Sequence, residues 1–256
     1  MNNEALVSGI ASLVAVALYL YLGWRLSRRR VAPESRFAAA QFSLFWLGLA
    51  AVSALGGLES LMAVNQVPPL TLVVTLLYLE ILLLCVVLWA LVSYLLFLFT
   101  GQGFLVPISL LYAGLYVLLL YFITASDPVR VTVKLGVVGE EFANTVSGPI
   151  LGVLLLVLLA PEFVGALLYF SLYFRTRDPT VRYRVTLVSW SLIGWFGLGF
   201  VDVGSALGGT LAAQIVARSI GLIAAVVILL AFYPPAPIRR RFGISAVEEI
   251  PRGSAS

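Results

Sequence analysis

Long apolar stretches alternate with short polar segments along almost the whole chain. Seven of these stretches reach the roughly 20 apolar residues that a helix needs to cross a membrane. They are much longer than the roughly 10-residue strand of a membrane barrel, and their polarity does not alternate. The pattern therefore predicts seven transmembrane helices, at residues 6–24, 37–63, 70–99, 104–124, 150–174, 185–207 and 210–233.

The composition supports the same fold class. Apolar residues make up 61% of the 256 residues and charged residues 11%, whereas a soluble domain is about half apolar and a quarter charged. We therefore expect an all-α integral membrane protein, a seven-transmembrane helix bundle that forms one domain over residues 1–243. Residues 244–256 are expected to form a flexible C-terminal tail, and its last part, 251–256, resembles a protease-site or linker remnant.

Basic residues collect on one side of the predicted helices, and such an excess marks the inner side of a membrane protein. With the N-terminus outside and the C-terminus inside, only Arg130 and Lys134 fall in outer segments. The inner segments carry Arg25, Arg28, Arg29, Arg30, Arg36, Arg175, Arg177, Arg182, Arg184, Arg239, Arg240, Arg241 and Arg252. A basic inner face suits anionic lipids. No nucleic-acid partner is expected, because the chain has no room for a basic groove outside the membrane.

The chain contains no histidine and a single cysteine, Cys85. Zinc and haem sites that need histidine, Ser-His-Asp catalysis and histidine proton relays are therefore excluded, as are disulfides within the chain. No motif specifies a nucleophile or a metal ligand set. We therefore expect a protein that is not an enzyme and that holds no metal.

The longest outer connection, residues 125–149, lies between the fourth and fifth predicted helices. Apolar and polar residues alternate over 129–135, the period of a half-buried strand. Gly136 and Gly139 follow as turn formers, and residues 140–146 could pair back onto the strand. We expect a β-hairpin over the outer mouth of the bundle, with an irregular loop as the alternative.

Five ionisable residues fall within the predicted helices, where charge is costly and often marks function. They are Glu59, Glu80, Glu162, Asp202 and Arg218. With a rise of about 1.5 Å per residue, all except Glu162 lie in the outer half of the membrane. We expect an Arg218–Glu80 ion pair, with Asp202 as the competing partner and Gln214 one turn away from Arg218.

Two interpretations of this cluster remain open. It is either an ion pair that holds three helices in register or a polar pocket that binds a ligand or protons from the outside. A single arginine leaves surplus acids, which must be protonated, hydrated or paired with a cation. Because desolvation favours the neutral form of a carboxyl group, Glu162 is the candidate protonatable residue. Pro161, directly before it, is expected to interrupt the fifth helix.

Aromatic side chains are plentiful in the predicted helices. Tyr78, Trp195 and Phe196 are candidates for lining the pocket. Trp46, Trp89 and Trp190 are expected to anchor the helices at the inner membrane surface, because tryptophan is enriched at membrane interfaces.

Seven helices with the N-terminus outside resemble the bundle of microbial rhodopsins. Those pigments hold retinal through a lysine near the middle of the seventh helix. The only lysine in this chain is Lys134, in the outer loop, and Arg218 stands near the position of the retinal lysine. Arginine cannot form the Schiff base, so the resemblance extends to the bundle and excludes covalent retinal as a cofactor.

A second resemblance is to the seven-helix sensor region of membrane histidine kinases. It rests on the basic first loop, Trp46, Glu59, the run from Tyr78 to Ile81, the Phe99-Thr100-Gly101 ending and the basic Arg182-Tyr183-Arg184 segment. No kinase domain follows the seventh helix in this sequence. The resemblance implies a receptor module whose output passes to a protein partner at the inner face, through Arg175, Arg177, Arg182 and Arg184.

These observations order the candidate functions. The first is a receptor- or sensor-like protein of the cell membrane that binds a small or lipophilic ligand in the polar pocket. The alternative is a proton-coupled transporter or channel that uses the intramembrane carboxylates. A further alternative is an accessory subunit of a membrane complex. The sequence leaves the oligomeric state open.

Overall fold

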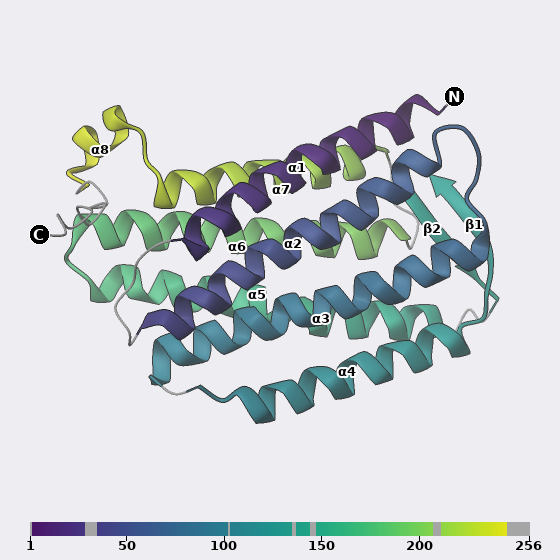
Figure 1. The fold of residues 1–256 in the computed structure, drawn as a ribbon, viewed down its shortest axis with the longest axis horizontal. Coiled ribbons are helices and arrows are strands. Elements are labelled where there is room, and N and C mark those ends of the chain that lie inside the picture. Colours follow the sequence, from purple (N-terminus) through teal and green to yellow (C-terminus); the bar gives the residue numbers. More distant parts are fainter. Residues whose placement is uncertain are drawn as a thin grey trace, which may run out of the picture.

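The computed structural model describes residues 2–28, 35–101, 103–134, 137–143, 147–206 and 211–244. These residues form seven long helices, one short helix and two strands, shown in Figure 1. The helices are α1 (Asn3–Ser27), α2 (Arg36–Met62), α3 (Leu70–Thr100), α4 (Leu105–Ala125), α5 (Ser147–Arg175), α6 (Pro179–Ala206), α7 (Leu211–Phe232) and α8 (Ala236–Phe242). Each apolar stretch that the sequence singles out overlaps one of the long helices.

Several of these helices could cross a membrane. Within the described residues, α1 to α5 are five helices that are long and apolar enough to do so. A sixth span results if the end of α7 and α8, which are bent by 67° relative to each other, are counted as one. The fold is therefore that of an all-α membrane protein. Seven spans, and the side of the membrane on which each end lies, remain predictions.

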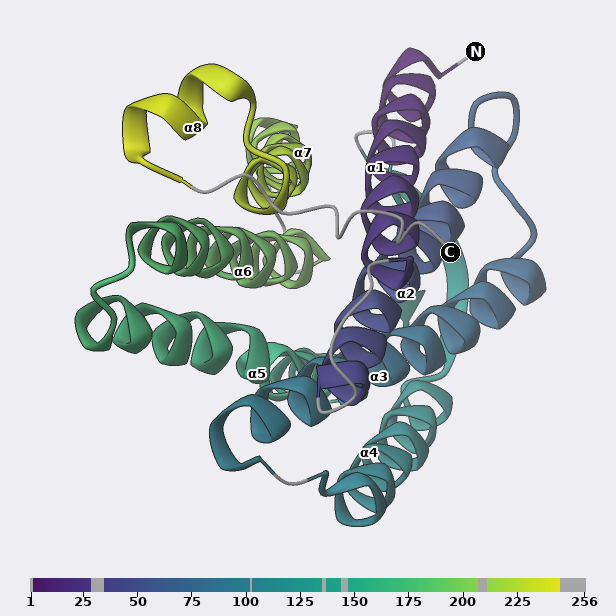
Figure 2. The ribbon, with the colours of Figure 1, turned by 60° about the vertical axis from the view of Figure 1, so that its left-hand side comes forward.

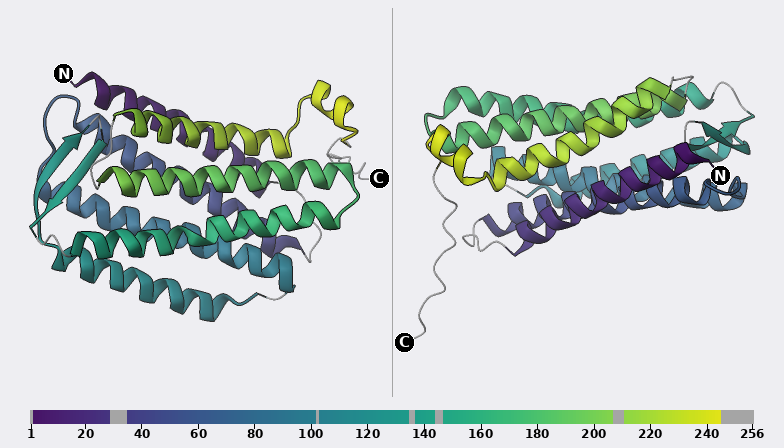
Figure 3. Two further views of the ribbon diagram at one scale, coloured as in Figure 1. Left: turned by 180° about the vertical axis from the view of Figure 1, so that it is seen from behind. Right: turned by 90° about the horizontal axis from the view of Figure 1, so that it is seen from above.

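The long helices form two layers, as Figures 2 and 3 show. Helices α1 to α4 make one layer and α5 to α7 the other. Consecutive helices within a layer contact each other. The layers meet along their edges, where α1 contacts α7 and where α5 contacts α3 and α4.

The contact between α1 and α2 depends on small residues. A Cβ atom at Gly9 would lie 2.7 Å from Leu61 Cδ2, and one at Gly23 would lie 2.7 Å from Leu47 Cγ. The Ser43 hydroxyl donates a hydrogen bond of 2.7 Å to the Gly23 carbonyl. Small side chains let helix backbones approach closely in lipid, so α1 and α2 are packed too tightly to accept even a methyl group at these glycines.

Aromatic rings fill the centre of the bundle, and one expectation about them is wrong. Trp46 is completely buried, with its ring centroid 5.8 Å from Tyr19 and 4.9 Å from Phe45. It is therefore a core residue and not an interfacial anchor. Trp190 is 61% exposed on the outside of the bundle, which fits a position facing lipid.

The two strands, β1 (Pro128–Lys134) and β2 (Val137–Phe142), pair in antiparallel orientation. The connection between them, residues 135–136, lies outside the described residues. Val138 packs with Ala5, Ala63 and Val73, so the sheet covers the ends of α1, α2 and α3. The sheet and the N-terminus lie at one end of the bundle and α8 at the other (Figure 1). That this is the outer end remains a prediction.

The structure differs from the sequence-based predictions at the proline of α5 and at the start of the C-terminal tail. Helix α5 runs without a break from Ser147 to Arg175 with Pro161 inside it, so the predicted interruption at Pro161 is wrong. Ile244, the first residue of the expected tail, is buried, and its N–H donates a 2.9 Å hydrogen bond to the Arg239 carbonyl. The rest of the tail, 245–256, lies outside the described residues.

Candidate functional site

The most unusual residue inside the bundle is Glu162 on α5. Its side chain is 1% exposed, and its Oε2 atom has no hydrogen-bond partner. Pro161, directly before it, has no N–H, so the Val157 carbonyl loses its helical donor. Buried polar groups are almost always hydrogen-bonded. A carboxyl group without a partner in the centre of a membrane bundle is therefore a candidate functional group.

Two tyrosine hydroxyls, from the opposite layer, lie within electrostatic reach of Glu162. They belong to Tyr19 on α1 and Tyr112 on α4. The Tyr19 hydroxyl donates a 2.9 Å hydrogen bond to the Gly221 carbonyl on α7, and its ring centroid lies 5.2 Å from that of Trp195 on α6. Tyr19 is thus the side chain that joins α1 to both α6 and α7.

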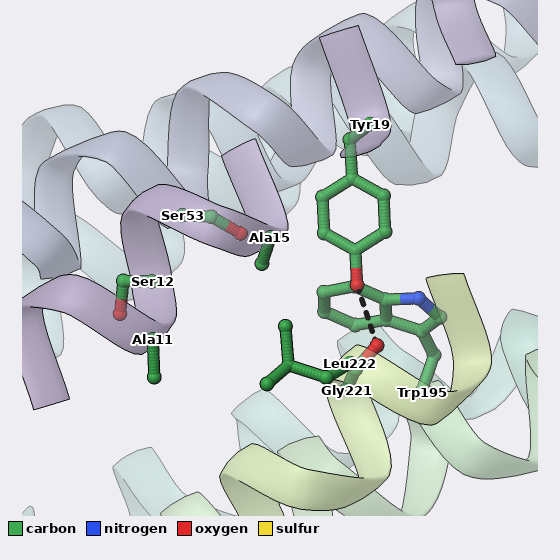
Figure 4. A pocket seen from close by; sticks show the side chains of 8 residues that line it. All are labelled: Ala11, Ser12, Ala15, Tyr19, Ser53, Trp195, Gly221 and Leu222. Atoms are coloured by element: carbon green, nitrogen blue, oxygen red, sulfur yellow. Dashed lines mark hydrogen bonds between the residues drawn. The ribbon is translucent and has the colours of Figure 1, made fainter. Parts of the chain in front are cut away.

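A cavity of about 30 Å³ lies beside Tyr19, between the two layers (Figure 4). Helices α1, α2, α6 and α7 supply its walls. The lining residues are Ala11, Ser12, Ala15, Tyr19, Ser53, Trp195, Gly221 and Leu222. A water molecule needs about 10–15 Å³ of such volume, so the cavity can hold only one or two water-sized groups in this packing of the helices.

Unused hydrogen-bonding atoms surround this part of the bundle. Ser12 Oγ and Trp46 Nε1 are buried and have no hydrogen-bond partner, whereas the Trp195 indole interacts with the Tyr19 side chain. Ser12 and Trp195 line the cavity itself. Because an unmet buried polar atom is costly, by about 1–3 kcal/mol, a small polar group placed here would be stabilised by both donors and acceptors.

Hydroxyl groups follow one face of α1 from its N-terminal end towards the cavity. Ser8 Oγ lies 3.3 Å from Ser60 Oγ on α2, and Ser12 follows one turn later at the cavity. Ser12, Ala15 and Tyr19 are spaced by three and four residues, so they share one face of the helix. Ser8, Ser12 and Tyr19 thus place three hydroxyl groups along one face of α1, with the apolar Ala15 between the second and the third.

The structure places one of the predicted acids, Glu80, in the contact between α2 and α3. A Cβ atom at Gly56 on α2 would lie 3.3 Å from Glu80 Oε1, so the Glu80 side chain reaches α2 at this glycine. Glu59 follows three residues later on α2 and is buried. Both acids take part in interactions.

The remaining members of the predicted cluster are only partly described. Asp202 lies on α6, and Gln214 and Arg218 lie on α7. The side chains of these three residues are outside the described part of the structure. The Arg218–Glu80 ion pair and its alternative with Asp202 therefore remain predictions.

The predicted pocket-lining aromatics have different positions. Trp195 lines the cavity. The Tyr78 hydroxyl lies 3.2 Å from Thr124 Oγ1, so this residue connects α3 to α4. The Phe196 ring lies 5.3 Å from Phe163 in the contact between α5 and α6. Ser12, Tyr19 and Ser53 were not predicted as cavity residues; for Ser12 and Tyr19 on α1, the hydroxyl groups on one face of an otherwise apolar helix were a usable signal.

The four arginines expected to contact a partner lie where α5 ends and α6 begins. Arg175 and Arg177 are exposed, whereas Arg182 and Arg184 are half-buried. Arg182 Nε donates a 2.7 Å hydrogen bond to the Thr176 carbonyl. Arg175 and Arg177 are therefore accessible to a partner, whereas Arg182 stabilises the turn between α5 and α6.

Among the described residues, no group of three His, Cys, Asp or Glu side chains could hold a metal ion. Comparisons with protein-family models, curated proteins and solved structures gave no match. The resemblances to rhodopsin bundles and to kinase sensor regions therefore remain predictions. The geometry defines the class as a helical membrane protein with a small cavity, lined mainly by apolar groups, between two helix layers.

Proposed function

We propose that this protein is a receptor- or sensor-like component of the cell membrane. A small polar or lipophilic ligand would bind between the two helix layers and change how they pack. The observation that supports this proposal is the cavity beside Tyr19, because both layers contribute to its walls and its lining includes the unpartnered hydroxyl group of Ser12.

The position of the cavity explains how binding could be coupled to movement. A ligand shifts a conformational equilibrium only if it binds one arrangement more tightly than the other. Ser12 and Ser53 belong to one layer, whereas Trp195 and Gly221 belong to the other. The contacts of a bound group would therefore depend on how the layers are placed. A ligand larger than the volume of about 30 Å³ would favour an arrangement in which the layers lie further apart.

Helix α7 offers a route from the cavity to the basic end of the protein. Gly221 accepts the hydrogen bond from Tyr19 near the cavity, and Leu230, nine residues further along the helix, accepts one of 3.1 Å from Tyr183 on α6. A shift of α7 at the cavity would therefore also move the start of α6. The neighbouring arginines, Arg175 and Arg177, would then present an altered surface to a partner protein.

The test is ligand-dependent thermal stability. The purified protein would be titrated with small alcohols, amides and ammonium compounds while its unfolding temperature is followed. Ala15→Leu adds bulk to the cavity wall and should abolish any stabilisation. Ala113→Leu makes the same change on the exposed side of α4 and should preserve it. Equal effects in the two variants, or no stabilisation of the native protein, would contradict the proposal.

A proton-coupled transporter or channel is the second candidate, and Glu162 favours it. Its carboxyl group is buried and its Oε2 atom has no hydrogen-bond partner, as expected for a group that binds and releases a proton inside the membrane. Proton flux into liposomes should then be measurable and should disappear in Glu162→Gln. A receptor would show no flux in either form. An accessory subunit, the third candidate, should be unstable when it is produced alone.

A further inference from the structure

The end of the bundle opposite the sheet carries a large excess of positive charge, and the proposed function does not account for all of it. The described arginines at this end are Arg25, Arg28, Arg36, Arg175, Arg177, Arg182, Arg184, Arg239, Arg240 and Arg241. Among the described residues, Asp178 is the only acid there, and its side chain accepts a 2.8 Å hydrogen bond from the Thr180 N–H. The surface therefore favours an anionic partner.

Several of these arginines lie over aromatic rings at the helix ends. The Arg28 guanidinium carbon lies 4.6 Å from the centre of the Trp24 ring, and that of Arg25 lies 4.9 Å from the Tyr233 ring. Trp24 is 45% exposed. Exposed aromatic residues at the ends of membrane helices sit at headgroup level. Stacking on such rings holds the guanidinium groups at the depth of lipid phosphates.

Helix α8 adds three consecutive arginines at the same end. It bends away from α7 by 67°, so it does not continue along the direction of the membrane-crossing helix. Figure 3 shows α8 turned aside at the end of the bundle. Its last residue, Phe242, is 53% exposed while its ring centroid lies 5.8 Å from Tyr183 on α6. Arginines beside an exposed aromatic ring are typical of a helix at a membrane surface.

We propose that α8, together with the adjoining end of α1, binds the headgroups of anionic phospholipids in the inner leaflet. Arginine suits this partner because its planar guanidinium group binds two phosphate oxygens at once. A soluble partner protein would need the arginines to stand clear of the membrane. The stacking of Arg25 and Arg28 on interfacial aromatics instead keeps them at its surface. The site is separate from the cavity and does not depend on a ligand there.

Lipid titration of the full protein in detergent tests this proposal. Native mass spectrometry would measure the affinity for phosphatidylglycerol and for phosphatidylcholine, which share a phosphate but differ in net charge. Inorganic phosphate would be added in a parallel titration to distinguish a lipid headgroup from a free anion. The variants are Arg240→Gln/Arg241→Gln on α8 and the control Arg175→Gln/Arg177→Gln, which removes two equally exposed charges from the same end.

The native protein should prefer phosphatidylglycerol. Each arginine near an anionic membrane surface contributes about fivefold in binding, so the α8 variant should lose this preference by about 25-fold. The control should retain it. Equal losses in the two variants would show diffuse surface charge and overturn the proposal. Equal affinity for the two lipids in the native protein, or full competition by inorganic phosphate, would overturn it as well. Circular dichroism would establish that each variant remains folded.

Discussion

Helix α1 has two faces that are packed in opposite ways. Towards α2, in its own layer, it presents Gly9 and Gly23, which leave no room for a Cβ atom. Towards α7, in the other layer, it presents Tyr19, whose hydroxyl bonds to a backbone carbonyl beside a cavity. One face is therefore interlocked, and the other has a polar contact next to unfilled space.

The difference indicates where the protein can move. Close-packed surfaces of small residues have few alternative arrangements, because any slip creates overlaps. A hydrogen bond to a helix carbonyl can be re-formed with another carbonyl, and a cavity accepts displaced side chains. The two layers are joined by tyrosine hydroxyls on both edges, through Tyr19 to Gly221 and through the hydrogen bond between Tyr94 and Tyr169. We therefore expect each layer to move as a unit.

The largest effect should come from disturbing the interlocked face. Gly23→Ala places a methyl group 2.7 Å from Leu47 Cγ and 3.2 Å from the Leu47 backbone nitrogen. Overpacking of this kind destabilises a protein by about 1–3 kcal/mol. The control is Gly114→Ala on α4, where nothing lies within 4 Å of the added atom. Denaturant unfolding in detergent micelles should show a loss for Gly23→Ala only, and equal stability of the two variants would contradict the description of this face.

The next-largest effect should be an increase in stability instead of a loss. Glu162→Met replaces a buried carboxyl group, one oxygen of which has no partner, with an apolar side chain of similar size. Removing an unmet polar group should stabilise the protein by about 1–2 kcal/mol. Glu59→Met is the matched control, since Glu59 is also buried but has an interaction partner, and it should be destabilising. A loss of stability in Glu162→Met would mean that the acid has a structural role.

A smaller effect is expected at the contact between the layers. Tyr19→Phe removes the hydrogen bond to Gly221 and keeps the ring packing, at a cost of about 1 kcal/mol. Tyr183→Phe removes a comparable bond to Leu230 within the second layer. Amide hydrogen exchange in α7 should increase near Gly221 in the first variant only. Unchanged exchange there would show that Tyr19 does not hold the layers together.

The smallest effect concerns the sheet. Arg130 Nε lies 2.6 Å from Glu141 Oε2, but both side chains are largely exposed. Exposed ion pairs contribute about 0–1 kcal/mol, so Arg130→Gln should leave the unfolding temperature almost unchanged. Val138→Ala should lower it more, because Val138 is the buried contact between the sheet and the helix ends. The reverse order would show that the ion pair, and not the apolar contact, holds the sheet in place.

The sequence located the long helices well because each is a continuous apolar run, and hydrophobicity alone identifies such runs. The sequence did not predict that the helices are divided into two layers. Most sides of these helices are apolar, so periodicity rarely shows which side faces a neighbour. Trp46 illustrates the limit, since its position near a predicted helix end suggested the membrane surface, whereas it lies in the core.

The candidate site was foreseen only in part. Glu162 and Trp195 could be selected because a charge or an indole deep in an apolar run stands out. Tyr19 and Ser53 could not be assigned in the same way, since their importance comes from α7 and α6 lying opposite them. Helix contacts between residues about 200 positions apart, such as Tyr19 and Gly221, depend on tertiary packing.

The closeness of Tyr19 and Trp195 has a practical consequence. Their ring centroids are 5.2 Å apart, and the indole lines the cavity between the layers. Indole fluorescence is sensitive to nearby polar groups, so the emission of Trp195 should change whenever the layers separate. The protein thus carries an intrinsic fluorophore at the contact between its layers, and a variant that keeps only this tryptophan could test for such a movement without an added dye.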